Sequence, residues 1–343
     1  LAFGGFYPNA GLGTPVRAVE MDLLAVDSFS DASVTFGADA AAIPAPLRNV
    51  HIVNAIALSA GENFTCALIQ GGTIKCWGYN GYGQLGDNST AQKTTPVAVS
   101  GITTAVAVSA GQFHTCARLA DGTVKCWGRN TWGQLGDNTV TQRSTPVTVL
   151  GIGGVSGISA GATSTCALLA NGEAMCWGDN TSGQLGNGNT ASLVPVSTAG
   201  ITSGLEVAVG TDNDYGCALL SNGTAKCWGL NTNGQLGYGH VNPIGDNEFP
   251  NVSGNVSLGD PIVEITAGST HTCARTPTGS VRCWGNSTYG QLGQANVLQI
   301  GDNEVPSVIQ PIDTGAQTTQ INSDNTHICA RLTTGGIRCW GRS

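Results

Sequence analysis

Charged side chains are scarce in this 343-residue chain, because Asp, Glu, Lys and Arg together make up only 10% of it. A soluble domain ordinarily carries about a quarter charged residues. The charges that are present are mostly acidic, 22 against 14 basic, for a formal net charge of -8. This balance provides no basic surface for nucleic acid or anionic lipid, so we expect neither as a partner.

Long apolar runs are also missing, since no stretch approaches the roughly 18 residues that a membrane helix needs. We therefore expect no membrane span. The chain begins at Leu1, which we interpret as the start of a mature chain or of an excised fragment. Glycine, in contrast, is abundant at 50 residues. This excess indicates a protein built from many turns.

The twelve cysteines form six pairs whose members are ten residues apart, and the first members step by 50, 50, 51, 56 and 56 residues. A period of about 50 residues is typical of a repeat protein, either a solenoid or a propeller. The pairs are Cys66 and Cys76, Cys116 and Cys126, Cys166 and Cys176, Cys217 and Cys227, Cys273 and Cys283, and Cys329 and Cys339.

Each pair flanks a glycine-containing break between runs of alternating apolar and polar residues, which is the pattern of a β-hairpin. If Cys116 faces Cys126, then Ala120, Asp121 and Gly122 remain as a three-residue loop. Such loops favour glycine at the third position, where the backbone is left-handed. All six copies have it, so we predict six disulfides, each within one hairpin, and an oxidising compartment. These glycines are Gly72, Gly122, Gly172, Gly223, Gly279 and Gly335.

Two metal sites are the alternatives to a metal-free protein. Zinc is disfavoured because no Cys-x-x-Cys spacing occurs. Calcium could use the acidic strings 244–248 and 300–304, or Asp87 and Asp137 after their turns. None of these matches a known calcium loop, and Asp, Asn and Gly are ordinary turn residues. We therefore predict no cofactor and keep calcium as the alternative.

Each hairpin ends in Cys-Trp-Gly, and in five copies Gly-Gln-Leu-Gly follows. A further segment then closes the repeat, and in several copies this segment contains Pro-Val. This order resembles the regulator of chromosome condensation repeat family, over residues 50 to 341. The resemblance implies an all-β fold, a seven-bladed β-propeller of four-stranded antiparallel blades. Gly-Gln-Leu-Gly stands at 83–86, 133–136, 183–186, 234–237 and 290–293.

The two chain ends divide one repeat between them. The sixth copy stops at 339–343, and residues 9–19 are an abbreviated version of its missing half. We expect their pairing to close the ring and remove the open edges. Residues 20–50 trace a cysteine-free copy, with Phe36 where Trp should be. The predicted organisation is one propeller over 1–343: a closing segment 1–19, a degenerate repeat 20–50 and six Cys-paired repeats 51–343. Six blades with an N-terminal appendage are the alternative.

Catalytic residues are not evident. His114, His271 and His327 share one repeat position, which Phe64 occupies in another copy. A general base or a metal ligand would not tolerate Phe there, so we expect these rings to pack structurally. No Ser or Cys nucleophile has a base and an orienting group beside it. We predict that the protein is not an enzyme.

One loop position favours binding. The residue before Gly-Gln-Leu-Gly is aromatic in three copies, as Tyr82, Trp132 and Tyr289. Equivalent propeller loops lie on one side, so these rings are predicted to form part of one face. Alternatively, each ring folds over its own blade.

Seven Asn-x-Ser/Thr triplets are candidate glycosylation sites, although a chain rich in these residues produces such triplets by chance. They begin at Asn63, Asn88, Asn180, Asn222, Asn251, Asn255 and Asn286.

These features together predict a secreted or cell-surface, non-catalytic propeller that presents one loop face to an extracellular protein or glycan. The alternative is a structural subunit of an extracellular fibre, appendage or matrix, whose partners are copies of itself. The resemblance also suggests guanine-nucleotide exchange on a nuclear GTPase. We disfavour that activity because of the predicted disulfides and the negative net charge.

Overall fold

A computed structural model of the protein describes residues 31–35, 49–188, 191–212, 214–246, 248–294 and 298–342. Regular structure in this part of the chain is β-strand, apart from one short 3-10 turn at Pro306–Val308. The all-β class is therefore confirmed. No helix in the described ranges is long and apolar enough to cross a membrane.

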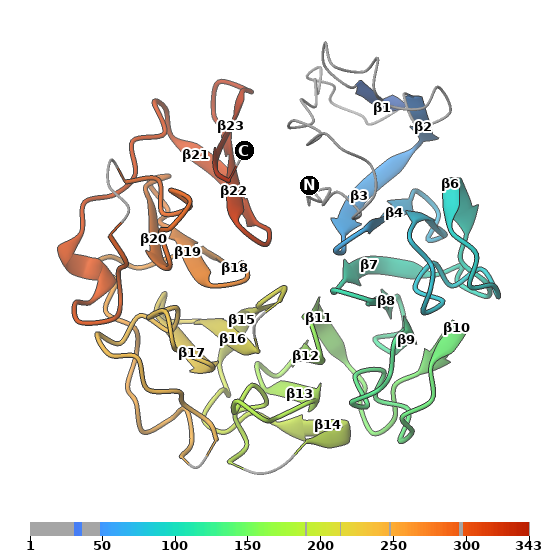
Figure 1. Ribbon diagram of the computed structural model, residues 1–343, viewed down its shortest axis with the longest axis horizontal. Helices are drawn as coiled ribbons and strands as arrows, with labels where there is room; N and C mark the ends of the chain where they lie inside the picture. Colours follow the sequence, from blue (N-terminus) through green and yellow to red (C-terminus); the bar gives the residue numbers. More distant parts are fainter. Residues whose placement is uncertain are drawn as a thin grey trace.

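Six sheets are arranged around a common centre, each with its first strand innermost, so the molecule is a β-propeller (Figure 1). All paired strands are antiparallel, and blades one to three have four strands each. The first blade contains β3 (Ala55–Ala60), β4 (Phe64–Ile69), β5 (Ile74–Gly78) and β6 (Lys93–Ala98). The second contains β7 (Ala105–Ala110), β8 (His114–Leu119), β9 (Val124–Gly128) and β10 (Arg143–Thr148). The third contains β11 (Val155–Ala160), β12 (Ser164–Leu169), β13 (Ala174–Gly178) and β14 (Ser192–Ser197).

Blades four to six have three strands each among the described residues. The expectation of four strands is therefore wrong for blades four and five, whereas the fourth strand predicted for blade six lies in residues 1–19, outside the described residues. The 56-residue repeats insert extra chain into the outer strand, which shrinks to isolated bridges such as Gly229 with Ile244 and Ala225 with Val256. The fourth blade contains β15 (Gly204–Val209), β16 (Tyr215–Leu220) and β17 (Ala225–Gly229). The fifth contains β18 (Glu264–Ala267), β19 (His271–Arg275) and β20 (Val281–Gly285). The sixth contains β21 (Thr318–Ser323), β22 (His327–Leu332) and β23 (Ile337–Gly341).

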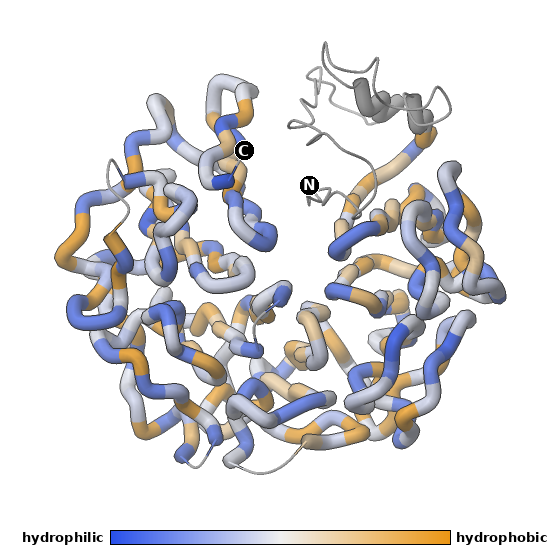
Figure 2. The backbone as a smooth tube through the Cα atoms, in the orientation of Figure 1, coloured by the Kyte–Doolittle hydropathy of each residue, from blue (hydrophilic) through white to orange (hydrophobic). Residues whose placement is uncertain are grey.

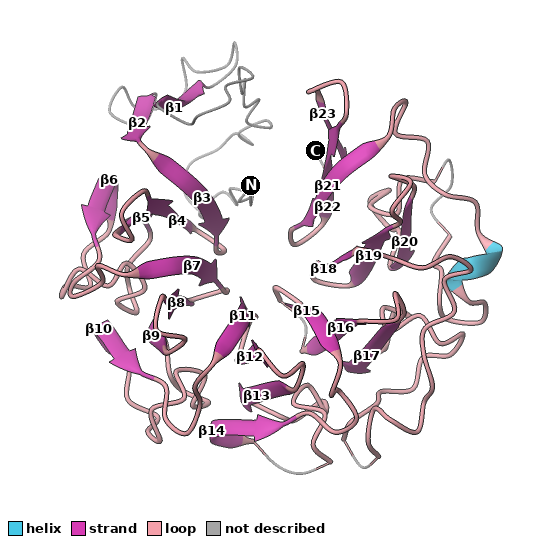
Figure 3. Ribbon diagram, turned by 180° about the vertical axis from the view of Figure 1, so that it is seen from behind, coloured by secondary structure: helices cyan, strands magenta, loops and turns pink. Residues whose placement is uncertain are grey.

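The N-terminal part is described only in small part. Strand β1 (Asp31–Thr35) pairs with β2 (Asn49–Val53) in a two-stranded sheet. The predicted closing segment 1–19 and most of the degenerate repeat 20–50 lie outside the described residues. Figure 3 shows the six blades from behind, with the sheet of β21 to β23 at one end of the series and the sheet of β3 to β6 at the other.

The hairpin register is the one predicted. Cys116 pairs with Cys126 across β8 and β9, and Leu119 N–H donates to Thr123 O at 2.9 Å around the three-residue loop. Gly122 in that loop has a φ of 79°, in the left-handed region. Disulfides join all six predicted pairs. No free cysteine remains among the described residues.

The core lies between neighbouring sheets, because a cluster of buried apolar residues joins adjoining blades. Hydrophobic and hydrophilic stretches alternate along the chain within the blades (Figure 2). The Trp after the second Cys of one blade and the Leu of the Gly-Gln-Leu-Gly turn are fully buried, as Trp127 and Leu85 illustrate. The indole of Trp127 donates to the carbonyl of Gln84 in the preceding blade. The same bond recurs from Trp177, Trp228, Trp284 and Trp340 to Gln134, Gln184, Gln235 and Gln291.

Candidate functional site

Two sets of loops meet on one face of the propeller. Phe64 at the start of β4 pairs with Gly78 at the end of β5, and Tyr79 N–H donates to Asn63 O at 2.8 Å. The loop after the first strand of a blade and the loop after its third strand therefore leave from the same side, whereas the hairpin turns lie on the other. We call the side with these two loop sets the loop face.

A buried asparagine holds the long loop of each of the first four blades in shape. Asn80 is inaccessible to solvent, and its amide nitrogen donates to Ser89 O and Ala91 O, both at 3.1 Å. Its amide oxygen accepts from Leu85 N–H at 3.0 Å. Sequence reasoning missed this residue, although Trp-Gly-x-Asn recurs and could have indicated it. The equivalents are Asn130, Asn180 and Asn231.

The residue before Gly-Gln-Leu-Gly, which the sequence indicated as a binding position, lies in the loop that the buried asparagine orders. Tyr82 N–H donates to the side-chain oxygen of buried Gln84 at 2.9 Å, which ties the ring-bearing residue to its turn. Trp132 is held in the same way by Gln134, and Tyr289 by Gln291. Side chains at this position therefore project from a turn whose backbone is already ordered.

The three predicted face residues differ in exposure. Trp132 is 41% exposed and Tyr289 is 48% exposed. Tyr82 is only half-buried, because its ring packs 5.1 Å from that of Phe113 and lies 5.5 Å from the Arg129 guanidinium carbon, both in the next blade. Its ring therefore packs against the neighbouring blade as well as against its own loop. Sequence reasoning missed Phe113 and Arg129, because their association with Tyr82 crosses two blades.

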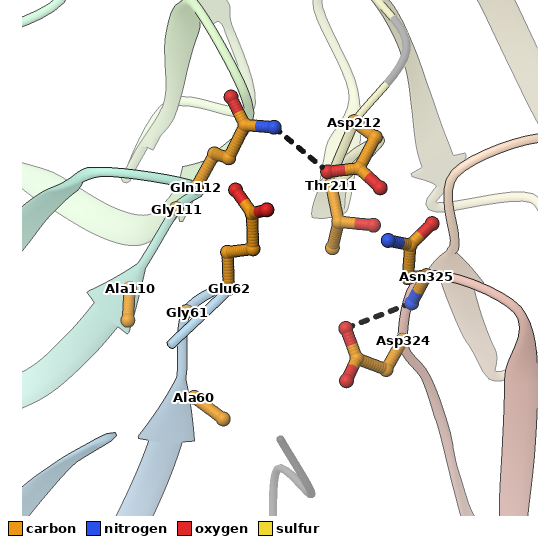
Figure 4. Close-up of a pocket in the computed structure, with 10 residues that line it drawn as sticks. All are labelled: Ala60, Gly61, Glu62, Ala110, Gly111, Gln112, Thr211, Asp212, Asp324 and Asn325. Atoms are coloured by element: carbon orange, nitrogen blue, oxygen red, sulfur yellow. Dashed lines mark hydrogen bonds between the residues drawn. The ribbon is translucent and has the colours of Figure 1, made fainter. Parts of the chain in front are cut away.

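The centre of the loop face is acidic. A small central cavity is lined by the loops that follow the innermost strands of several blades (Figure 4). Glu62, Asp212 and Asp324 contribute carboxylates, and Gln112 donates to Asp212 at 3.1 Å. Burial, reinforced by the neighbouring carboxylates Glu62 and Asp324, raises the pKa of Asp212 to about 6. In the described part of the chain, no three His, Cys, Asp or Glu side chains converge as a metal site requires.

The acidic turn residues considered for calcium have other partners. Asp137 accepts from the Arg143 guanidinium at 2.8 Å, and Asp87 lies 3.3 Å from Lys93 Nζ. Burial alone would raise the pKa of Asp87, but hydrogen bonds from Ser89, Lys93 and Asn80 outweigh it and lower that pKa. These carboxylates therefore stabilise their loops.

Two of the three histidines at the shared position are buried, and His327 is half-buried. His114 and His271 are inaccessible to solvent, and His114 Nε2 lies 2.8 Å from Thr165 Oγ1 in the next blade. Burial lowers the pKa of both imidazoles to about 3, with smaller contributions from Arg129 and His327 respectively. Both rings are therefore neutral at physiological pH and act as packing groups.

The candidate glycosylation sites fall into separate environments. Asn180 is buried, and its amide nitrogen, where a glycan would be attached, donates to Asn187 Oδ1 at 2.9 Å. A glycan there is incompatible with the folded loop, so we withdraw Asn180 as a candidate. Asn63 and Asn286 are half-buried. The exposed candidates are Asn88, Asn222, Asn251 and Asn255.

Comparison with known families identifies the repeat. The regulator of chromosome condensation (RCC1) repeat matches at 55–84, 105–134, 155–184, 206–235 and 262–291, and a second form of it matches at 72–118, 121–168 and 222–275. Together these ranges cover more than half of the chain. The chain belongs to the RCC1 repeat family. The sequence resemblance is thereby confirmed.

Curated relatives match this RCC1 repeat protein over part of their length. The human E3 ubiquitin-protein ligase HERC2 is 29% identical over 110 residues, which are 32% of this chain and 2% of HERC2. Human protein RCC2 is 32% identical over 115 residues, 34% of this chain and 20% of RCC2. The aligned region is thus a small fraction of either relative.

Several solved structures share the fold, among them an RCC1 protein. Yeast RCC1 (Prp20) in complex with Kap60 gives a TM-score of 0.70 at 19% identity, over 85% of this chain and 73% of Prp20. Human WBSCR16 gives 0.70 at 21% identity, over 86% and 79%. The ectodomain of the receptor kinase CR4 of Physcomitrella patens gives 0.54 at 22% identity, over 84% and 62%. At these identities the likeness establishes the architecture alone.

Proposed function

We propose that this RCC1 repeat protein is a non-catalytic, secreted or cell-surface propeller that binds an extracellular protein or glycan with its loop face. The observation that carries the proposal is the set of exposed rings on ordered turns. Tyr79, Trp132 and Tyr289 are 38%, 41% and 48% exposed. Aromatic side chains are enriched where interfaces derive most of their binding energy.

The loops of the loop face have a fixed backbone conformation, and this favours binding. The backbone around each ring is fixed by buried side chains, as Asn130 and Gln134 fix the turn that carries Trp132. A face that is ordered before contact loses little conformational entropy when a partner docks. Scaffolds of this kind gain affinity from pre-organisation rather than from a large area.

The extracellular placement rests on the cysteines. Disulfides persist in oxidising compartments and are rare in the cytosol and nucleus, and six are present here. Among proteins with this fold, the CR4 chain is described as a receptor ectodomain. Ligase activity belongs to HERC2 and Kap60 binding to Prp20, and we transfer neither to this chain.

The finer architecture is part of the same proposal: residues 20–50 form a seventh, degenerate blade, and residues 1–19 complete the last blade together with the end of the chain, which closes the ring. Trp77 in the first blade is only half-buried, whereas Trp127 and its equivalents in blades three to five are fully buried. In the sixth blade Cys339 is exposed, although the second Cys of every other blade is buried. A further blade would cover both Trp77 and Cys339.

Deletion of residues 1–19 should then lower the melting temperature, and an unchanged temperature contradicts closure of the ring by this segment.

The binding proposal is tested with the purified chain and two loop-face variants, Trp132→Ala and Tyr289→Ala. Screening on a glycan array and against extracellular proteins should give a saturable ligand whose affinity falls in at least one variant. Val308→Ala, an exposed apolar change in the 3-10 turn, serves as the matched control and should bind normally. A ligand that both loop-face variants bind normally contradicts the assignment of the face.

The fibre alternative predicts a different assembly state. Electron microscopy of the purified chain should show single propellers if the binding proposal is correct. Native filaments built from this chain, together with no ligand in the screens, would instead favour the structural subunit.

A further inference from the structure

Three aromatic rings and one guanidinium form a contiguous cluster on the loop face. The rings of Tyr79 and Tyr82, from the first blade, lie 6.3 Å apart, and each contacts Phe113 of the second blade, at 6.2 and 5.1 Å. The Arg129 guanidinium carbon lies 5.5 Å from the centre of the Tyr82 ring and 5.9 Å from that of Phe113. We call these four residues the aromatic cluster.

The cluster exists because these two repeats depart from the others at specific positions. Tyr79 and Arg129 occupy the same position, directly after Trp-Gly, in consecutive repeats. Between Tyr79 and Tyr82 the first repeat has Gly81, where the next four repeats have Thr. A Cβ at Gly81 would collide with the Tyr79 hydroxyl. The glycine therefore leaves room for the Tyr79 ring to lie back over its own loop, against Tyr82 and Phe113.

Arg129 is held by hydrogen bonds, but no described residue forms an ion pair with it. Its backbone N–H donates to Phe113 O at 2.9 Å, and its Nε donates to Thr131 Oγ1 at 2.9 Å. Within the described ranges no carboxylate oxygen lies within 4.0 Å of its guanidinium. The cations of the neighbouring loops differ in this respect, since Lys93 and Arg143 are both paired with aspartates.

A guanidinium of this kind recognises carboxylates. Its planar fork of donors matches the two oxygens of an Asp or Glu side chain. Stacking on two rings holds the fork in place, so less side-chain entropy is lost on binding. The adjoining Tyr79 ring, 38% exposed, offers an apolar surface for the residue next to that carboxylate. Tyr and Arg are also enriched at the energetic centres of protein interfaces.

The rest of the loop face directs an acidic partner towards the cluster. Glu62, Asp212 and Asp324 gather at the central cavity, and like charges brought together across an interface are unfavourable. An acidic segment is therefore repelled from the centre and accepted at the cluster. We propose that the aromatic cluster binds an acidic segment of a protein partner, with an Asp or Glu side chain on Arg129. This inference rests on the proposed use of the loop face for binding.

The test selects peptides from a random 12-residue phage library on the purified chain. Sequences that the wild-type chain retains should be enriched in Asp and Glu. A synthetic copy of the most enriched peptide should bind Arg129→Gln about tenfold more weakly than wild type, as expected for a central interface residue. Lys75→Gln, which removes the same charge from the exposed middle of β5, is the matched control and should bind like wild type. Raising the salt concentration should weaken the wild-type complex.

A second variant separates geometry from charge. Gly81→Thr installs the residue native to the equivalent position in the next four repeats, so the loop should fold. It should displace the Tyr79 ring and weaken the peptide several-fold while Arg129 is retained. Selected peptides without acidic bias, or equal binding to wild type and Arg129→Gln, overturn the inference. A glycan ligand lost in Trp132→Ala but kept in Arg129→Gln overturns it while supporting the proposed function. No ligand of either kind contradicts both.

Discussion

Trp127 Nε1 donates a 2.9 Å hydrogen bond to the carbonyl oxygen of Gln84, in the turn of the preceding blade. The same oxygen accepts from Thr115 Oγ1 at 3.0 Å. Both donors belong to the second blade and the acceptor to the first, so a buried polar bond links the two sheets. A Cβ at Gly86 would lie 2.7 Å from this indole nitrogen, which explains why the turn ends in glycine. Neighbouring blades are therefore held in register as well as packed together.

Replacement of this indole should destabilise the protein. Trp127→Phe removes one donor from a buried carbonyl and leaves space where the larger ring packed. We expect a loss of about 2 kcal/mol in the free energy of unfolding, measured by denaturant titration. Trp77→Phe is the matched control, because Trp77 is half-buried and the described residues supply no turn carbonyl for it. Equal losses in the two variants would mean that the bond between blades contributes nothing.

Close backbone packing around the central cavity gives a second prediction. Gln112 N–H donates to Gly161 O at 3.0 Å, linking the inner loops of two blades. A Cβ at Gly111 would collide with that same Gly161 oxygen. Gly111→Ala should therefore cost about 1–3 kcal/mol, as over-packing does. Gly153→Ala, where a Cβ meets nothing within 4 Å, should be neutral in the same thermal denaturation experiment. A neutral Gly111→Ala would show that the inner loops can separate freely.

The hairpins could be predicted because their information is local. The ten-residue spacing of Cys116 and Cys126 and the glycine at the third loop position leave one register, and the structure has it. The reduced outer strand of the fourth blade could not be predicted in this way. Its bridging residues, Ile244 and Val256, are separated by inserted chain, and no local pattern indicates which residues pair with β17.

The site was predictable only where it belongs to a single repeat. Position in the repeat placed Trp132 on a turn of the loop face, and the structure leaves its ring exposed. The contacts of Tyr82 with Phe113 and Arg129 depend on how the second blade packs beside the first. The spacing of residues along the sequence does not indicate how two blades pack together. The aromatic cluster therefore could not be predicted without the structure.

The cysteine pairing predicts a thiol count. After expression in a secretory host, alkylation of the denatured but unreduced chain should modify no cysteine, and reduction before alkylation should make all twelve reactive. The reason is that six intra-hairpin bonds consume every thiol. Mass spectrometry of the intact chain reads both states. Thiols that react without reductant would contradict the oxidised state on which the extracellular proposal depends.

Glu206 predicts a dependence of stability on pH. Burial raises the pKa of Glu206 to about 7, even though Ile265 N–H donates to its carboxylate at 3.0 Å. The nearby Glu264 adds to the rise, and Arg275 opposes it. Because the folded pKa exceeds the ordinary value of 4.5, the folded state binds the proton more tightly. The contribution to stability is therefore present below about pH 4.5 and is lost as the pH rises through 7.

Glu206→Gln should remove this dependence. Between pH 5 and pH 8 the wild type should lose on the order of 2 kcal/mol relative to the variant, since one pKa unit corresponds to about 1.4 kcal/mol. Melting temperatures of both proteins across this range provide the measurement. Parallel curves for wild type and variant would assign the pH dependence to other groups.

The sequons give a prediction that separates chance triplets from usable sites. After expression in a eukaryotic secretory host, Asn251 and Asn255, both exposed, should be open to glycosylation and Asn180 should stay unmodified. Site-resolved mass spectrometry measures the occupancy.

Asn251→Gln should leave the melting temperature unchanged apart from the loss of any glycan. Asn180→Ala should lower stability by about 1–3 kcal/mol, because the amide of Leu185, 2.8 Å from Asn180 Oδ1, loses its buried acceptor. A glycan on Asn180 in the folded protein would contradict the loop structure.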